Sequence, residues 1–217
     1  MFPGMTDASL DDPTDQLVLH TLVVKGYCSE DAAADATGLQ LEAVARSLAR
    51  LSGAGLAQYR DGRISGWSPS PAARARHREL VEGPLAVADR ARAMAAYERF
   101  SALNTKFKHV CTDWQVRPGA DGTLIPNEHN DVAYDAAVIA RLGEIHASAS
   151  GVCSELAPCF SRAARYQDRL ATALAALEAG DRDRFTRPLC GSYHDVWMEL
   201  HQDLIVTLGL ARTAADT

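Results

Sequence analysis

The stretch that decides the fold is Ala34-Asp35-Ala36-Thr37-Gly38-Leu39-Gln40-Leu41-Glu42-Ala43-Val44. A small residue, a glycine four positions later and a branched apolar residue six positions after that have the spacing of a helix-turn-helix. Ala34 lets two helices approach, Gly38 allows the backbone angles of the turn, and Val44 packs the second helix onto the first. The outer face of the second helix would then be available to the major groove of double-stranded DNA.

That outer face carries polar side chains of the kind that recognise bases. Glutamine can read adenine, and arginine can read guanine or hold a phosphate. An ordinary helical hairpin with a solvated polar face has the same spacing, so the flanking segments must decide between the two. The residues on or near the face are Gln40, Glu42, Ala43, Arg46, Ser47 and Arg50.

The flanking segments predict three helices followed by a hairpin. Residues 15–24 read as a first helix capped by Thr14 or Asp15, Ser29 starts a second that Gly38 ends, and residues 39–51 form a third. Its apolar stripe comprises Leu41, Val44, Leu48 and Leu51. Residues 56–67 then read as two short strands joined by a turn at Asp61-Gly62. Three helices and a hairpin are the layout of a winged helix, with Arg60 and Arg63 beside the tip, where a wing touches phosphates or the minor groove.

The charge distribution favours the same region. The 217 residues are 47% hydrophobic and 23% charged, as in a soluble globular protein, and the net charge of −6 argues against a uniformly basic surface. Residues 42–80, however, hold seven arginines against three acidic residues. This local excess of positive charge coincides with the predicted recognition helix and wing.

Residues 29–78 resemble the winged-helix domain of MarR-type bacterial regulators. Trp67-Ser68-Pro69-Ser70-Pro71-Ala72-Ala73-Arg74 is similar to the segment of that family that leads from the second wing strand into a helix. Pro69, Ser70 and Ala73 replace the usual leucine, threonine and glycine, and the wing is several residues shorter. Asp61-x-Arg63 is similar to the family's wing motif. The resemblance implies a DNA-binding transcriptional regulator.

The second part of the chain is predicted to be helical throughout. A helix begins near Ala72, with a possible break at Gly83-Pro84. Helical stretches are expected at residues 85–114, 131–151, 156–179 and 192–208, with a loop at 117–123, a connection at 181–191 and no strand after residue 84. The predicted fold class is therefore mainly α. It has a flexible acidic N-terminus (1–14), a winged helix-turn-helix domain (15–82) and a helical bundle (83–217).

Two helices of the bundle carry the candidate ligand site. The stripe Tyr97, Phe100, Asn104, Phe107, Cys111 and Trp114 has heptad spacing and is expected to be core, but an asparagine in it needs a polar partner or a polar ligand. In the last helix Ser192 and Asp195 form a capping box, and the stripe Tyr193, Trp197, Leu200 and Leu204 is apolar. The predicted pocket for a small organic effector comprises Asn104, Phe107, Trp114, Tyr193, His194, Trp197 and His201.

This bundle also resembles an extension of actinobacterial MarR-like regulators, a resemblance that names no effector. It rests on three segments: Asn104 to Lys108, Cys111 to Gln115 and Ser192 to Leu204. We expect a homodimer, because one winged helix makes few base contacts and two half-sites supply the affinity.

Other functions stay open at this stage. One alternative is an enzyme with a polar pocket around His194, Glu199 and His201, and another is a metabolite- or drug-binding protein that has lost DNA binding. No sequence motif assigns a catalytic residue or a cofactor. His194 and His201 lie seven residues apart, about 10 Å along a helix, too far to share a metal ion. Scattered cysteines, no secretory signal and no membrane-length apolar run favour the cytoplasm.

Overall fold

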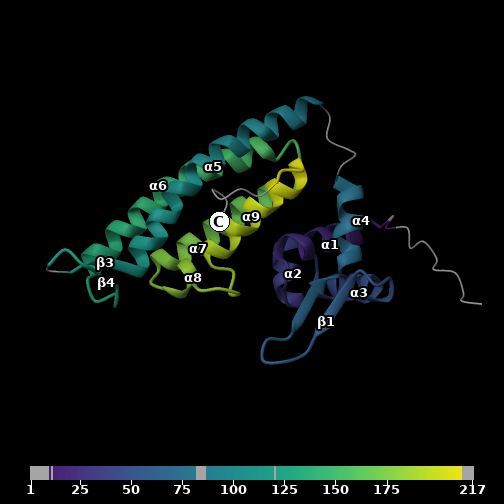
Figure 1. The fold of residues 1–217 in the computed structure, drawn as a ribbon, viewed down its shortest axis with the longest axis horizontal. Helices are drawn as coiled ribbons and strands as arrows, with labels where there is room; N and C mark the ends of the chain where they lie inside the picture. Colours follow the sequence, from purple (N-terminus) through teal and green to yellow (C-terminus); the bar gives the residue numbers. More distant parts are fainter. Residues whose placement is uncertain (1–9, 11, 82–86, 120, 212–217) are drawn as a thin grey trace, which may run out of the picture. The chain divides into compact units, whose positions relative to one another are not determined.

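The computed structural model describes residues 10, 12–81, 87–119 and 121–211, and its elements are mainly helices (Figure 1). The chain divides into two compact units, residues 1–84 and 85–217. The elements of the first unit are α1 (Pro13–Lys25), α2 (Glu30–Thr37), α3 (Leu41–Gly53), β1 (Ala57–Arg60), β2 (Gly66–Pro69) and α4 (Pro71–Val81). Those of the second are α5 (Val87–Gln115), β3 (Val116–Pro118), β4 (Leu124–Pro126), α6 (Val132–Leu156), α7 (Ala163–Glu178), α8 (Asp183–Thr186) and α9 (Tyr193–Leu208).

Three of the predictions fall wholly or partly outside the described residues. The predicted domain boundary at 82/83 and the break at Gly83-Pro84 lie in the segment 82–86, and most of the predicted flexible N-terminus lies in residues 1–9 and 11. Residues 13 and 14 of that predicted N-terminus belong to α1. Among the described helices, none is both long enough and apolar enough to cross a membrane.

Glycines end both helices that precede α3. Gly26 and Gly38 have φ angles of 71° and 74°, in the left-handed region that glycine adopts without steric cost. At the other end of α1, the side chain of Asp12 accepts a hydrogen bond from the backbone N–H of Thr14. The prediction that Thr14 or Asp15 is the cap is therefore wrong, because Pro13 starts the helix earlier and Asp12 satisfies its free amide.

Helix α3 packs against α1 and α2 through most of its predicted apolar stripe. Val44, Leu48 and Leu51 are buried in the core of the first unit, as predicted. Leu41 is 40% exposed, so the prediction that it belongs to the buried stripe is wrong. It is the first residue of α3, directly after the turn.

The hairpin that follows α3 has a wider tip than predicted. Strands β1 and β2 are antiparallel and end on the pair Arg60 and Gly66, which leaves residues 61–65 in the loop instead of a two-residue turn. The hydroxyl of Ser65 donates to Asp61 and accepts from the N–H of Gly62, so side-chain hydrogen bonds close the wider loop. Cys28 adds a one-residue bridge to Trp67 on the other side of β2.

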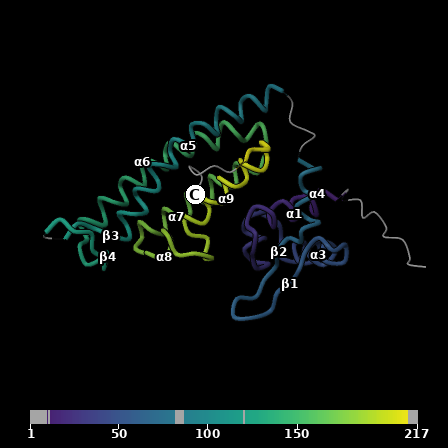
Figure 2. Tube along the Cα trace, in the orientation of Figure 1, coloured from purple at the N-terminus to yellow at the C-terminus, as the bar shows by residue number. Residues whose placement is uncertain are grey.

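The second unit is built on four long helices. Helix α5 packs on α6, α6 on α7, α7 on α9 and α9 on α5, so the four form a closed ring around one apolar core (Figures 1 and 2). The predicted core stripe of α5 is confirmed at four of its six residues: Phe100, Asn104, Phe107 and Trp114 are buried, whereas Tyr97 and Cys111 are half-buried against the same core. The capping box at Ser192 and Asp195 is confirmed as well.

Two segments of this unit differ from the prediction of helices and loops alone. Residues 116–118 and 124–126 pair as the antiparallel hairpin β3–β4, and Gly122, with a φ of 82°, turns the chain between them. The expectation of no strand after residue 84 is therefore wrong. The predicted connection at 181–191 contains the short helix α8, whose Phe185 is buried in the bundle core. Its burial explains why this segment is ordered as a helical turn.

Candidate DNA interface and candidate ligand sites

Helix α3 presents several of the predicted DNA-contacting side chains to solvent. It follows α2 after only three residues, a connection made possible by the left-handed Gly38. Gln40, Glu42 and Arg46 are exposed, and Ala43 is half-buried. Gln40 is the N-cap of α3, and the other three lie in its N-terminal half, the end that contacts bases in helix-turn-helix proteins.

The prediction that Ser47 lies on this outer face is wrong. Its side chain is buried, and its hydroxyl donates a hydrogen bond of 2.6 Å to Asp15 of α1. Arg50 also turns to that carboxylate, with Nε 2.9 Å and Nη2 2.7 Å from its two oxygens, and contacts Asp12 at 3.1 Å. Arg50 is 48% exposed, but these bonds make it a residue that holds α3 on α1.

The carboxyl group of Asp15 stays ionised in this cluster. Burial raises its pKa, but the hydrogen bonds from Arg50 and Ser47 together outweigh burial, so the pKa lies below its ordinary value. A doubly hydrogen-bonded carboxylate–guanidinium pair has a defined geometry. The orientation of α3 in the first unit is therefore set by α1 as well as by apolar packing.

A set of arginines in this unit makes no ion pair with a carboxylate among the described residues. These arginines are all exposed, and they come from α3, the hairpin and α4. Asp61, the acidic residue nearest the hairpin tip, is bound to Ser65. An exposed guanidinium without a carboxylate partner is suited to a phosphate. The set comprises Arg46, Arg60, Arg63, Arg74 and Arg78.

In the second unit, most of the predicted effector pocket forms one stack of rings. Phe107 lies 4.3 Å from Trp197 between ring centroids, and Phe100 lies 4.6 Å from the same indole. Tyr193, His194 and His201 also contact these rings. The indole N–H of Trp197 donates a 2.9 Å hydrogen bond to Asn104, so the buried amide finds its partner inside the core.

Trp114 lies apart from this stack, in a second cluster at the start of α6. Phe185 of α8 contacts both Trp114 and Phe107 and so connects the two clusters. The prediction of one pocket from all seven residues thus divides into two places. Burial lowers the pKa of His194, which belongs to the stack, and of His146, whose ring contacts Tyr193.

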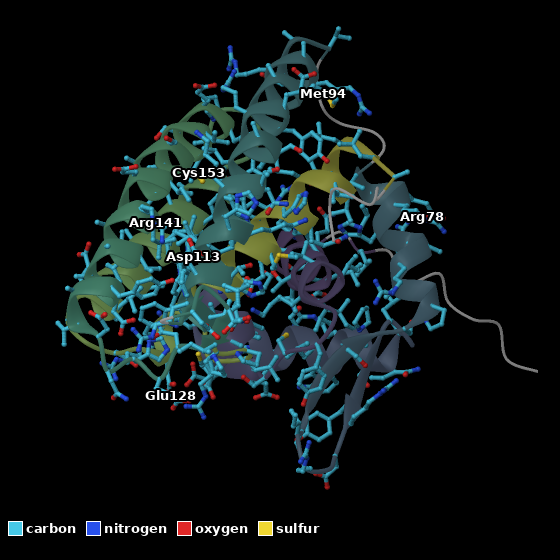
Figure 3. The ribbon with its side chains drawn as sticks, turned by 60° about the vertical axis from the view of Figure 1, so that its left-hand side comes forward. Arg78, Met94, Asp113, Glu128, Arg141 and Cys153 are labelled. Atoms are coloured by element: carbon cyan, nitrogen blue, oxygen red, sulfur yellow. The ribbon has the colours of Figure 1, made fainter. Side chains whose placement is uncertain are left out.

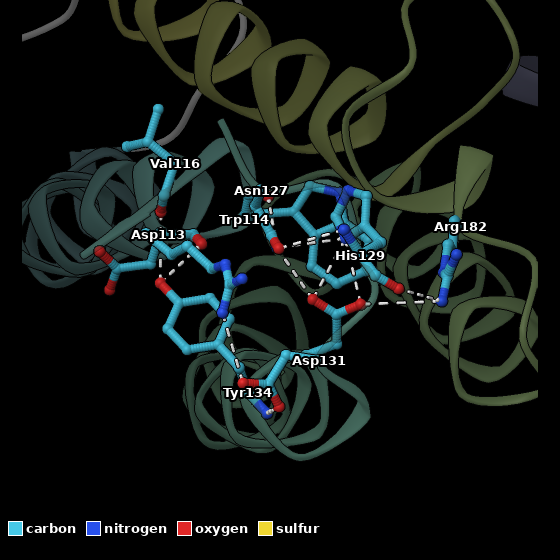
Figure 4. A network of polar contacts seen from close by, with 10 residues as sticks. Asp113, Trp114, Val116, Asn127, His129, Asp131, Tyr134 and Arg182 are labelled. Atoms are coloured by element: carbon cyan, nitrogen blue, oxygen red, sulfur yellow. Dashed lines mark hydrogen bonds and ion pairs between the residues drawn. The ribbon is translucent and has the colours of Figure 1, made fainter. Parts of the chain in front are cut away.

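The second cluster is a polar network around His129, a residue that no sequence pattern indicates (Figure 4). Its imidazole lies over Trp114 with 4.3 Å between ring centroids, and its Nδ1 is 3.1 Å from both oxygens of Asp135. The amide of Asn127 donates to Asp135 at 2.9 Å and to the carbonyl of Trp114 at 3.1 Å. Arg182 donates to the carbonyl of His129 at 2.9 Å.

Neighbouring contacts tie this cluster to α5. The hydroxyl of Tyr134 donates to the carbonyl oxygens of Asp113 and Val116, at 3.0 Å and 3.2 Å. The carboxylate of Asp113 also forms an ion pair with Arg141 of α6, with 2.6 Å between Oδ2 and Nη1. The two residues lie next to one another in Figure 3. The polar segment that follows β4 is the one sequence signal that could have drawn attention to this end of the bundle.

Helices α7 and α9 share a buried ionic network that the sequence does not predict either. Asp203 is fully buried and accepts two 2.8 Å bonds from Arg162, one of 3.0 Å from Tyr166 and one of 2.7 Å from Thr207. One turn earlier, Glu199 receives a 2.6 Å bond from Arg169. Glu199, a residue of the alternative enzyme site, is thus part of an ion pair inside the bundle.

The described residues offer no metal site and no activated thiol. No group of three or more histidine, cysteine or acidic side chains among them could hold a metal ion. All five cysteines are free thiols, and burial raises the pKa of Cys111 and Cys153 to about 12. These two thiols stay protonated at neutral pH and are poor nucleophiles.

Comparison with known proteins does not assign a function. No family model, curated protein or solved structure matches the chain.

Proposed function

We propose that the chain is a DNA-binding transcriptional regulator in which the first unit acts as a winged helix and α3 is the recognition helix. The observation that carries this proposal is the set of five exposed arginines without a carboxylate partner in the described residues. They come from α3, the hairpin and α4, and they lie in a region with an excess of positive charge. Phosphate contacts supply most of the affinity of proteins for DNA.

The arginine of α3 and the arginines of the hairpin have different roles in this proposal. Gln40, the N-cap of α3, and Arg46, in its N-terminal half, read base edges in the major groove. Arg60 and Arg63 belong to the hairpin that acts as the wing, and they contact the phosphate backbone or the minor groove. Arg50 has no direct contact with DNA and instead keeps α3 in position through Asp15.

The second unit is proposed to serve dimerisation and the sensing of a small organic molecule. Two copies of the winged helix on one operator make twice the base contacts of a single copy. A ligand that binds one arrangement of the two recognition helices more tightly would shift the population toward it and change the affinity for DNA.

The test compares three single arginine-to-alanine variants of the full-length protein. The preferred duplex is first selected from a random library with the wild-type protein, and its affinity is then measured by fluorescence anisotropy. We expect Arg46→Ala and Arg63→Ala to weaken binding roughly tenfold or more, since each removes a base or phosphate contact. Arg92→Ala removes the same charge from an exposed position of α5 and should leave the affinity within about twofold.

Two results would contradict the proposal. One is a failure of the selection to enrich any sequence. The other is a result in which the Arg46→Ala, Arg63→Ala and Arg92→Ala variants all bind the duplex with wild-type affinity. Circular dichroism checks that each variant is folded, because all three side chains are exposed and their loss should cost less than about 0.5 kcal/mol of stability.

A further inference from the structure

In the polar cluster at the start of α6, one side chain keeps a hydrogen-bonding nitrogen that the described residues do not occupy. Its supporting groups, Trp114, Asn127 and Asp135, are all buried. His129 is 23% exposed, and the described part of the chain provides no hydrogen-bond partner for its Nε2. The buried groups therefore hold an imidazole whose second nitrogen is available.

The hydrogen bonds of Asn127 determine which nitrogen of His129 carries the proton. The side-chain amide has two hydrogens, and they are directed to the carbonyl of Trp114 and to Asp135. Neither remains for Nδ1 of His129, which lies 3.1 Å from the Asp135 oxygens. In neutral His129, Nδ1 is thus the donor to Asp135, and Nε2 has a lone pair that accepts a hydrogen bond.

The backbone of His129 supports a functional role for this arrangement. Its φ is 57°, in the left-handed region that is uncommon for residues other than glycine. Residues in such conformations persist where the surrounding contacts hold them, and they gather at functional sites. Here the contact with the Trp114 ring and the bonds to Asp135 hold the imidazole in one orientation.

Arg182 adds a positive group beside this histidine. One of its nitrogens, Nη2, donates to the carbonyl of His129 and lies 3.9 Å from Asp135 (Figure 4). The side chain is 55% exposed, so the other donors of the guanidinium face water. A guanidinium with free donors matches the two oxygens of a carboxylate.

We propose that His129 and Arg182 form a binding site for a small hydroxycarboxylate. The carboxylate of the ligand pairs with Arg182, and its hydroxyl donates a hydrogen bond to Nε2 of His129. Asp135 and Asn127 are positioning residues, because they fix the tautomer and the orientation of the imidazole without touching the ligand. This inference deepens the sensing role of the proposed function and rests on that role for its biological meaning, but binding at the site does not require DNA.

The test uses three small probes that separate the two contacts. Glycolate has both a carboxylate and a hydroxyl, acetate has only the carboxylate, and ethylene glycol has only hydroxyls. Each is titrated into full-length protein without DNA, and the ¹⁵N signals of the His129 ring are followed by NMR at constant pH and ionic strength. We expect a saturable change at Nε2 with glycolate, and binding of the other two weaker by about tenfold or more.

Two variants and a matched control complete the test. His129→Asn removes the imidazole but retains a residue type that tolerates a positive φ, and Arg182→Gln removes the guanidinium from an exposed position. Both should reduce glycolate binding about tenfold, measured by calorimetry, whereas Arg187→Gln, at another exposed arginine, should leave it unchanged.

Three results would overturn the assignment of the site. They are equal responses to the three probes, no saturable response to glycolate, and unchanged glycolate binding in both variants. A protein that fails to bind DNA but shows the expected glycolate response would contradict only the proposed DNA-binding function. The thermal unfolding midpoint of each variant is measured alongside, and Arg182→Gln decides the outcome if His129→Asn does not fold.

Discussion

The Asp203→Asn variant is expected to unfold with a free energy about 3 kcal/mol lower than that of the wild-type protein, because it leaves Arg162 without a counter-charge. The carboxylate is fully buried and accepts hydrogen bonds from Arg162, Tyr166 and Thr207. Asparagine has the same shape as aspartate, but one of the two carboxylate oxygens is replaced by an NH2 group. This group donates hydrogen bonds, and the side chains around it are donors as well, so they cannot pair with it. The guanidinium then faces another donor in a site of low polarity.

Urea unfolding followed by circular dichroism measures this loss. The matched control is Asp168→Asn, a change of the same charge at an exposed position of α7, which should shift the stability by less than about 0.5 kcal/mol. A loss of less than about 1 kcal/mol in Asp203→Asn would mean that water or a rearranged Arg162 compensates the charge. The network would then contribute little to holding α7 on α9.

Gly66→Ala is expected to destabilise the first unit by about 3 kcal/mol, because an added methyl group has no space. A Cβ at this position would lie 2.7 Å from the carbonyl oxygen of Cys28 and 2.6 Å from the hydroxyl of Tyr27. Real Cβ atoms essentially never come this close to another heavy atom. The carbonyl cannot move away without cost, because it accepts a hydrogen bond from the N–H of Trp67.

Gly62→Ala provides the control in the same hairpin. A Cβ at Gly62 would meet nothing within 4 Å, so this variant should unfold at the wild-type temperature. Hydrogen exchange of α1 and α3 reports on the first unit separately from the bundle. Faster exchange in Gly66→Ala but not in Gly62→Ala is the expected result. Equal protection in both variants would show that the bridge between Cys28 and Trp67 adapts to the methyl group.

Local patterns in the sequence predict several helix ends and most helix faces correctly. Gly38 ends α2 and Ser192 caps α9 because a left-handed glycine and a capping side chain act on their own neighbours. Periodicity likewise predicts the buried faces of α5 and α9. Such features need no knowledge of which segments meet in space.

Several of the wrong assignments involve partners far away in the chain. Ser47 and Arg50 lie at polar positions of an amphipathic helix, and only their contact with Asp15, more than 30 residues earlier, removes them from the outer face. Strands β3 and β4 contain three residues each, too few for an alternating pattern to appear. The cluster around His129 is assembled from α5, the segment after β4, α6 and the segment before α8, so no single stretch of sequence displays it.

The salt dependence of DNA binding by the wild-type protein tests the central claim most directly. The full-length protein is titrated into a labelled duplex of random sequence, and its affinity is measured from about 50 to about 200 mM salt. If the exposed arginines neutralise phosphates, the logarithm of the binding constant falls linearly with the logarithm of salt, by about 0.9 for each phosphate contact. No detectable binding at the lowest salt, or an affinity that does not change with salt, would contradict DNA binding as the function of the first unit.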